Sequence, residues 1–158
     1  MSTMFNASEV LQFAIKIEEN GEEFYRNMAV KIDKDSIKNT FNFLADEEVK
    51  HREIFKEMIS RVENYRPAES FPGEYFQYLR SYADEHIFTK AKTMKLKMEE
   101  INSALEAIRF AIEMELDSVH YYTEAKSLIP DSQRKTIDKI IEEERRHYLK
   151  LIEAKKVA

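Results

Sequence analysis

Residues 35–51 read DSIKNTFNFLADEEVKH, and residues 131–147 read DSQRKTIDKIIEEERRH. A shift of 96 positions aligns the second stretch with the first and matches identical residues along its length. The matched pairs are Asp35 and Asp131, Ser36 and Ser132, Thr40 and Thr136, Glu47 and Glu143, Glu48 and Glu144, and His51 and His147. Each stretch ends in Glu-x-x-His, a spacing that puts the carboxylate and the imidazole on one face of a helix. The chain therefore presents the same pair of polar side chains twice.

The segments that precede these stretches are also repeats, related by a shift of 97 positions. Glu18 falls on Glu115, and Tyr25 falls on Tyr122. The other matched pairs are Glu9 and Glu106, Phe13 and Phe110, Ala14 and Ala111, and Ile15 and Ile112. A duplication of this extent predicts two similar helix hairpins in one chain.

The composition favours an all-α fold. The chain has 158 residues, of which 43% are hydrophobic and 35% are charged, and these values fit a single ordered domain. Only two glycines and three prolines are present, whereas an all-β domain of this length would need them in many turns. We therefore expect one domain over residues 1–158, with its repeats at 6–65 and 103–158.

Helical periodicity is clear in four segments, residues 7–32, 36–65, 103–128 and 131–155. Capping boxes open two of them, at residues 6–9 and 103–106. The short loops 33–35 and 129–131 make each consecutive pair of helices antiparallel. The pattern predicts a four-helix bundle made of two antiparallel hairpins.

A long crossover, residues 66–102, joins the two hairpins. We expect a short amphipathic helix near residues 74–87 inside it, and a solvated connection at the lysine-rich residues 90–98. Aromatic side chains are frequent in the crossover, which indicates that it covers a hydrophobic surface of this bundle or of a second subunit. We expect a homodimer.

The sequence argues against several classes of protein. A net charge of −5 argues against a general nucleic-acid binder. No run approaches the roughly 18 apolar residues of a membrane span, and residues 1–13 do not resemble a signal peptide, so we expect no membrane association and a cytoplasmic protein. The chain has no cysteine, which excludes thiolate nucleophiles and cysteine-bound metals on it.

Glu18 and Glu115 each lie in the middle of an otherwise apolar helix face, flanked by small residues such as Gly21 and Ser118. With the two Glu-x-x-His pairs they make a set of candidate metal ligands, Glu18, Glu48, His51, Glu115, Glu144 and His147. Buried carboxylates without cations would repel one another and lose their hydration. Two divalent ions would balance the carboxylates of this set, and oxygen and imidazole ligands suit iron or manganese.

This set resembles that of the ferritin-like di-iron carboxylate proteins, and within them the rubrerythrin-type domain. The resemblance covers all the predicted long helices and fills every ligand position. It implies two bound iron ions, with manganese as the alternative. One half of the site would come from Glu18, Glu48 and His51, and the other from Glu115, Glu144 and His147. It also implies a non-haem di-iron oxidoreductase that reduces hydrogen peroxide or dioxygen and needs no further catalytic side chain.

The chain departs from that family in ways that bear on its partners. Ser118 stands where rubrerythrins usually carry an extra glutamate. The cysteines of the rubredoxin domain are missing from this chain, so the resemblance implies a separate electron-donor protein.

Two other functions fit the same pattern. An iron-sequestering protein with slow ferroxidase activity would use the same site but would take up iron beyond two ions per chain. A structural or interaction bundle with a degenerate site would bind no stoichiometric metal and would tolerate alanine at the ligand positions.

Two tyrosines accompany the candidate ligands. Tyr25 and Tyr122 each follow a central glutamate by seven positions and share its helix face, so they are candidates to hydrogen-bond to the carboxylates. The alternative is an ordinary core tyrosine with a satisfied hydroxyl.

Acidic residues also lie next to the candidate ligands in the sequence, and two further histidines lie outside the repeat. Glu47 and Glu143 point about 100° away from the ligands and are expected at the surface. Asp46 and Glu142 are the candidates for the outer partner that a ligating imidazole needs. The histidines outside the repeat, His86 and His120, are expected on solvated faces.

Overall fold

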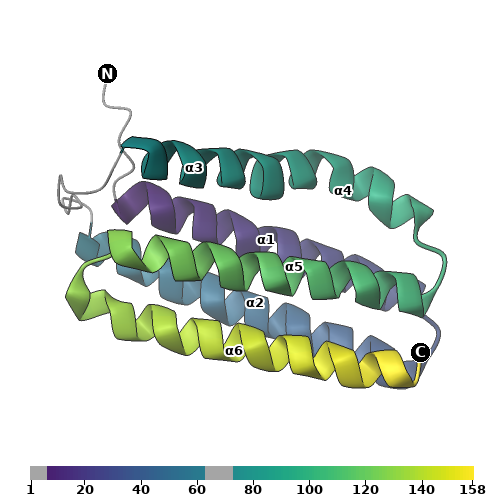
Figure 1. The fold of residues 1–158 in the computed structure, drawn as a ribbon. Coiled ribbons are helices and arrows are strands. Elements are labelled where there is room, and N and C mark those ends of the chain that lie inside the picture. The colour runs from purple at the N-terminus through teal and green to yellow at the C-terminus, as the bar shows by residue number, and fades with distance from the viewer. Residues whose placement is uncertain (1–6, 63–72) are drawn as a thin grey trace.

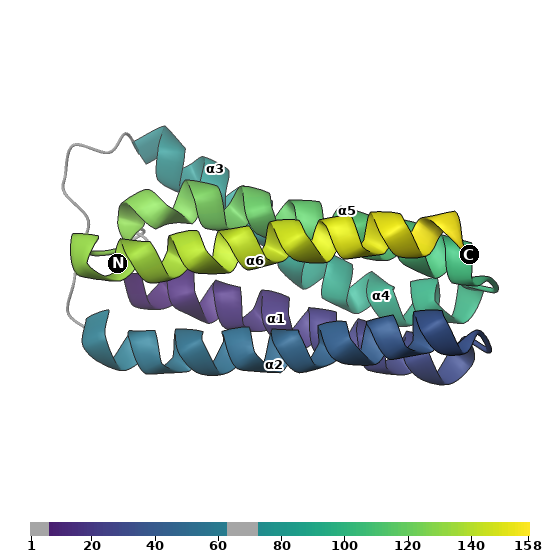
Figure 2. The same cartoon turned by 90° about the horizontal axis from the view of Figure 1, so that it is seen from below.

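The computed structural model describes residues 7–62 and 73–158, and this part contains helices and no strand. The long helices are α1 (Ala7–Lys31), α2 (Asp35–Val62), α5 (Ala104–Ala125) and α6 (Asp131–Lys156). They lie side by side in a bundle (Figure 1), which is also seen along a second direction (Figure 2). The predicted all-α four-helix architecture is confirmed.

The bundle consists of two antiparallel hairpins. Helix α1 packs along α2, and α5 packs along α6, while contacts of α1 with α5 and of α2 with α6 join the hairpins. Helix α5 ends earlier than predicted and is followed by the 3-10 turn η2 (Lys126–Leu128). None of the described helices is both long and apolar enough to cross a lipid bilayer.

The capping box at the start of α5 is present. The Glu106 backbone N–H donates to Ser103 Oγ at 3.1 Å, and the Asn102 backbone N–H donates to Glu106 Oε2 at 3.0 Å. The first bond satisfies a donor that the first turn of a helix leaves free, and the second ties the residue before the N-cap to the helix, so together they fix where α5 begins. The box predicted at residues 6–9 begins outside the described residues, as do the last predicted positions of the second helix, 63–65.

The crossover contains more helix than predicted. It holds three consecutive segments, α3 (Gly73–Ala83), the π-helical turn η1 (Asp84–Phe88) and α4 (Thr89–Glu100). The lysine-rich stretch is therefore helical, and Lys95 and Lys97 in it are exposed. Met94 and Met98, four residues apart, are buried in the bundle core. These methionines give an otherwise polar stretch an apolar stripe, and this stripe docks α4 on the bundle.

The crossover lies along the side of the bundle formed by α1 and α5. Figure 1 shows the α3–α4 ribbon running beside these helices, and contacts join α4 to α1 and α3 to α5. Helices α2 and α6 form the opposite side (Figure 2). The crossover therefore covers only one side of the bundle.

The apolar core is divided into two clusters. One includes Leu11 and Phe55, and the other includes Phe24 and Leu151. Each long helix contributes apolar residues to both clusters and carries polar residues between them. The buried polar residues are Glu18, Glu48, His51, Glu115, Ser118, Glu144 and His147. The two clusters thus enclose a polar layer at mid-height of the bundle.

Candidate metal centre

The polar layer brings the six predicted ligands together, and none is more than 4% exposed. Helices α1 and α5 contribute one glutamate each, while α2 and α6 contribute a Glu-x-x-His pair each. Helical register turns these side chains toward the centre of the bundle. Apolar residues one or two turns away on the same helix face pack in the two core clusters and hold that face inward.

The donor atoms form two groups, in each of which all atoms lie within 4.8 Å of one another. One group is Glu18, His51 and Glu144, and the other is Glu48, Glu115, Glu144 and His147. The grouping differs from the halves expected from the sequence, because Glu48 reaches across the bundle and its Oε1 lies 3.8 Å from His147 Nδ1. Glu144 belongs to both groups, which is the position that a carboxylate shared by two ions requires.

Both histidines present Nδ1 to these carboxylates. His51 Nδ1 lies 2.8 Å from Glu144 Oε1 and 3.5 Å from Glu18 Oε2. His147 Nδ1 lies 3.6 Å from Glu115 Oε2 and 3.7 Å from Glu144 Oε1. The two rings stack with centroids 5.6 Å apart. The Nδ1 atoms of both rings therefore face the same polar cluster.

Several of these inward-facing atoms have no hydrogen-bond partner among the described residues. They are Glu18 Oε2, His51 Nδ1, Glu115 Oε2, both carboxyl oxygens of Glu144, and His147 Nδ1. Buried polar atoms are usually satisfied, and leaving them unpaired is costly. Divalent cations would pair with these oxygen and nitrogen atoms, so the residues fit a two-ion centre.

Burial and mutual repulsion control the charge of the carboxyl groups. Burial, together with the charges of Glu18 and Glu144, raises the pKa of Glu48 well above its usual range. Burial and the charges of Glu115 and Glu18 likewise raise the pKa of Glu144. Burial also opposes ionisation of Glu18, but its close contacts with Glu48 and His51 outweigh burial and lower the pKa of Glu18. In the absence of a cation, protons therefore balance part of the negative charge.

The imidazole of His51 takes part in this balance. Burial lowers its pKa, but the nearby carboxylates of Glu144 and Glu18 outweigh burial and raise the pKa to about 12. A cation that binds at this position takes the place of a proton.

Two tyrosines hold carboxylates from the opposite hairpin. Tyr25 OH donates to Glu115 Oε1 at 2.6 Å, and Tyr122 OH donates to Glu18 Oε1. Burial, followed by the charge of the accepting carboxylate, raises the pKa of each tyrosine well above its usual value. Both hydroxyls therefore stay protonated and remain donors.

Glu143 was expected at the surface but contacts a candidate ligand. His51 Nε2 donates to Glu143 Oε2 at 2.7 Å, since an ionised carboxylate can only accept. This bond leaves Nδ1 as the ring nitrogen that is available to a cation. Sequence reasoning missed the contact because Glu143, whose side chain is 31% exposed, lies at the edge of α6 from which it also reaches α2. The equivalent residue Glu47 gives no hint of it, since it pairs with Lys50 at 3.1 Å.

Asp46 and Glu142, the predicted outer partners of the imidazoles, form other ion pairs. Asp46 Oδ1 lies 2.6 Å from Arg26, and Glu142 lies 3.8 Å from Arg146. Both side chains are exposed, so neither holds a histidine of the cluster.

Small residues beside the cluster have separate reasons to be small. A Cβ atom at Gly21 would lie 2.7 Å from Glu48 Oε2, so this glycine makes room for the carboxylate. Ser118 is 6% exposed and donates to the Met114 carbonyl at 3.0 Å. Ser118 therefore adds no charge to the cluster.

His86 and His120 are exposed as expected, yet both contact neighbouring elements. His120 Nε2 lies 2.7 Å from Tyr78 OH, and His86 Nδ1 lies 3.5 Å from Asp117 Oδ2. These contacts link the crossover to α5.

Comparison with known proteins agrees with this geometry. The sequence model of the rubrerythrin family matches residues 9–155. A crystal structure from Thermotoga maritima, described as a candidate ferritin-like diiron-carboxylate protein, matches the fold with a TM-score of 0.70. The sequence identity is 31%, and the match covers 96% of this chain and 95% of that chain. Among curated proteins, none matches the chain.

Proposed function

Because the chain belongs to the rubrerythrin family, we propose that it is a non-haem di-iron oxidoreductase that reduces hydrogen peroxide or dioxygen at the buried cluster. The observation that carries this proposal is the set of buried carboxylate and imidazole atoms that face one another without hydrogen-bond partners. A protein that used these residues only for packing would leave them unsatisfied, at a cost of roughly 1–3 kcal/mol for each group.

The proposed ligands are Glu18, Glu48, His51, Glu115, Glu144 and His147. Their four carboxylates balance the charge of two divalent ions. Oxygen and imidazole donors favour iron or manganese, and we propose iron because the chain belongs to the rubrerythrin family and its structural relative is described as a candidate diiron-carboxylate protein.

When bound, a pair of ferrous ions supplies the two electrons that, with two protons, convert one hydrogen peroxide to two waters. We propose that a separate donor protein returns those electrons. The expectation of a homodimer also stays a prediction.

The remaining residues prepare the site. Tyr25 and Tyr122 orient the carboxylates of Glu115 and Glu18 through their hydrogen bonds. Glu143 orients the ring of His51. The two apolar clusters on either side exclude water, which strengthens every electrostatic interaction between the ligands and a bound cation.

An anaerobic titration of metal-free protein with Fe(II) tests the proposal. We expect saturation at two ions per chain, followed by oxidation of both ions when hydrogen peroxide or dioxygen is added. Parallel titrations with Mn(II) compare the two metals. A folded protein that binds no stoichiometric metal would contradict the proposal and favour an interaction bundle. Continued uptake well beyond two ions per chain would favour iron sequestration.

A further inference from the structure

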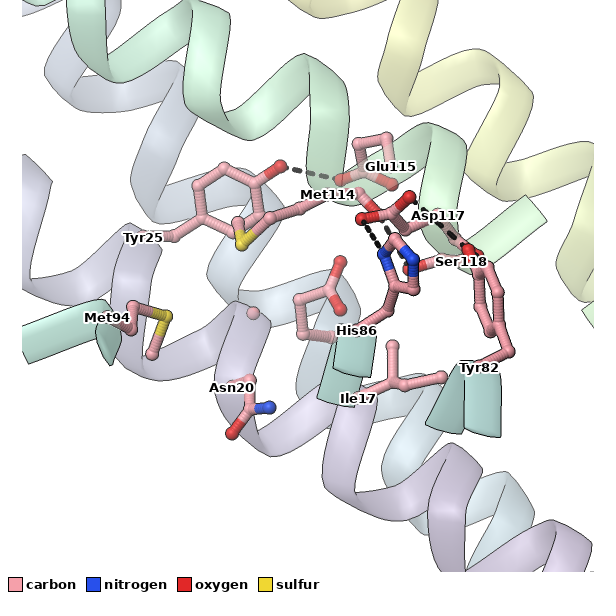
Figure 3. A pocket seen from close by; sticks show the side chains of 12 residues that line it. Ile17, Asn20, Tyr25, Tyr82, His86, Met94, Met114, Glu115, Asp117 and Ser118 are labelled. Atoms are coloured by element: carbon pink, nitrogen blue, oxygen red, sulfur yellow. Dashed lines mark hydrogen bonds and ion pairs between the residues drawn. The ribbon is translucent and has the colours of Figure 1, made fainter. Parts of the chain in front are cut away.

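A small pocket lies between the crossover and the metal centre. It is lined by residues of α1, α2, α5 and the crossover helices, and its volume is about 40 Å³. Figure 3 shows side chains from these elements pointing into one space. Glu48 and Glu115 form part of its wall, so the pocket reaches two of the proposed ligands directly. The histidine ligands, His51 and His147, do not line it.

The residues that line this pocket differ in exposure. At the outer end, the side chains of His86 and Asp117 are 43% and 31% exposed. At the inner end, Ser118 is 6% exposed and Glu115 is 2% exposed. The pocket therefore leads from the surface to the carboxylate side of the cluster.

Polar groups of the crossover form the outer end. His86 Nδ1 lies 3.5 Å from Asp117 Oδ2, and Tyr82 OH donates to Asp117 Oδ1 at 3.3 Å and to its carbonyl at 3.2 Å. The rings of Tyr82 and His86 stack with centroids 4.2 Å apart. His86 belongs to the π-helical turn η1. Such turns are rare in proteins, and those that occur are often found at functional sites.

The size of the pocket limits what it can hold. A water needs about 10–15 Å³ of such volume, whereas pockets for larger organic ligands measure about 300–1,000 Å³. A cavity of about 40 Å³ therefore admits a molecule the size of hydrogen peroxide and excludes bulky organic hydroperoxides.

We propose that this pocket binds the small oxidant and that His86 and Tyr82 of the crossover set the size of the molecule that reaches Glu48 and Glu115. The inference rests on the proposed function. Reduction of any hydroperoxide consumes two protons and two electrons, and two ferrous ions would supply the electrons. The O–O bond breaks. The products are two waters from hydrogen peroxide, or one water and one alcohol from an organic hydroperoxide. The pocket selects among hydroperoxides by size, because the same bond breaks in all of them.

The first test needs no metal and uses the absence of cysteine in this chain. Ser118→Cys puts a single thiol at the inner end of the pocket. Ala111→Cys is the matched control, because Ala111 is buried on the same helix and does not line the pocket. We expect small methyl methanethiosulfonate to modify Ser118→Cys at least about tenfold faster than Ala111→Cys, whose reaction requires local opening. Equal rates in the two variants would overturn the proposed route.

Adding His86→Ala to Ser118→Cys tests the outer end. We expect a bulky maleimide, which reacts slowly with Ser118→Cys alone, to react roughly tenfold faster after this change because less of the pocket is closed. His120→Ala is the control, since His120 is an exposed histidine that also contacts Tyr82 but does not line the pocket. An unchanged maleimide rate in the His86→Ala protein would overturn the role of His86.

The second test uses protein loaded with two Fe(II) ions per chain. We expect hydrogen peroxide to oxidise the bound iron much faster than cumene hydroperoxide, and His86→Ala to reduce this preference roughly tenfold without changing the iron stoichiometry. An unchanged preference, with iron bound and oxidised, would overturn the inference and leave the proposed function intact. Failure to bind iron would overturn the proposed function, while the thiol reactions still decide whether the pocket is open as inferred.

Discussion

His51 and His147 occupy equivalent positions in the two hairpins, but their outer nitrogens have different surroundings. His51 Nε2 donates to Glu143 of the other hairpin, whereas no hydrogen bond to His147 Nε2 is present among the described residues. The equivalent of Glu143 is Glu47, which pairs with Lys50 on its own helix. The duplication thus fixes where the ligands lie along each helix, whereas the contacts between hairpins have diverged. We infer from this difference that the two metal positions are unequal.

The largest effect is expected from the carboxylate that the two groups share. Glu144→Ala removes a donor from both groups, whereas Glu48→Ala removes one from a single group. We expect bound Fe(II) to fall from two ions per chain to near zero in Glu144→Ala and to about one in Glu48→Ala. Equilibrium dialysis with metal analysis measures both.

Glu47→Ala is the control for these variants, because Glu47 is adjacent to Glu48 but pairs with Lys50. Circular dichroism would check that each variant is folded. Equal losses in Glu144→Ala and Glu48→Ala would contradict the shared position of Glu144.

Glu143→Gln tests the inequality of the two positions. A glutamine keeps the shape but removes the charge that orients the His51 ring, and losses of outer partners typically cost about 10–100-fold in metal affinity. We expect this loss for one of the two ions only, which a biphasic Fe(II) titration would resolve. Glu47→Gln, at the equivalent position of the repeat, should leave both affinities unchanged. If both variants weaken binding equally, the two positions are equivalent and the comparison fails.

The sequence predicts where the ligands lie along each helix better than it predicts the contacts between helices. Helical register and the repeat suffice to bring Glu18, Glu48 and Glu144 to one level of the bundle. The contact of Glu143 depends on how α6 crosses α2, and a repeat cannot predict it because the two hairpins differ there. The helix α4 was missed for a related reason: its apolar stripe consists mainly of two methionines, and only docking on the bundle shows their use.

The pH dependence of stability tests whether both hairpins contribute buried acid groups. Glu48 and Glu144 have raised pKa values, and the pKa of His51 is raised to about 12, so all three hold protons more strongly in the folded metal-free protein than in the unfolded chain. Their stabilising contribution is complete below the unfolded pKa values of about 4.3 for Glu and 6.5 for His, and it is lost as pH rises. The pKa of Glu18 is lowered, so its stabilising contribution is present above about pH 4.3 and is lost as pH falls below that value.

We therefore expect the melting temperature of the metal-free protein to fall by several degrees from pH 5 to pH 9. Glu48→Gln and Glu144→Gln should each flatten this slope, because a glutamine does not titrate. A melting temperature that rises over this range in the metal-free protein would contradict the assignment.

The smallest effect is expected where the two hairpins are most alike. Tyr25→Phe and Tyr122→Phe each remove one hydrogen bond to a carboxylate of the opposite hairpin, and each should cost about 1–3 kcal/mol of unfolding free energy. Urea denaturation of the metal-free variants measures these losses. Tyr121→Phe is the control, because its hydroxyl donates to the Val10 carbonyl outside the cluster. It should lower stability without changing metal affinity, and clearly unequal losses for Tyr25 and Tyr122 would show that the symmetry is limited to the sequence.

The crossed tyrosines also bear on how such a chain could arise. Tyr25 of one hairpin holds Glu115 of the other, and Tyr122 returns the same contact to Glu18. Reciprocal contacts of this kind are what two identical subunits make about a two-fold axis. An ancestral single hairpin would have assembled the whole site by pairing with its own copy. Fusion of the two copies into one chain removed the requirement that every contact occur twice, and the bond between Glu143 and His51 is a contact that only a fused chain could acquire on one side alone.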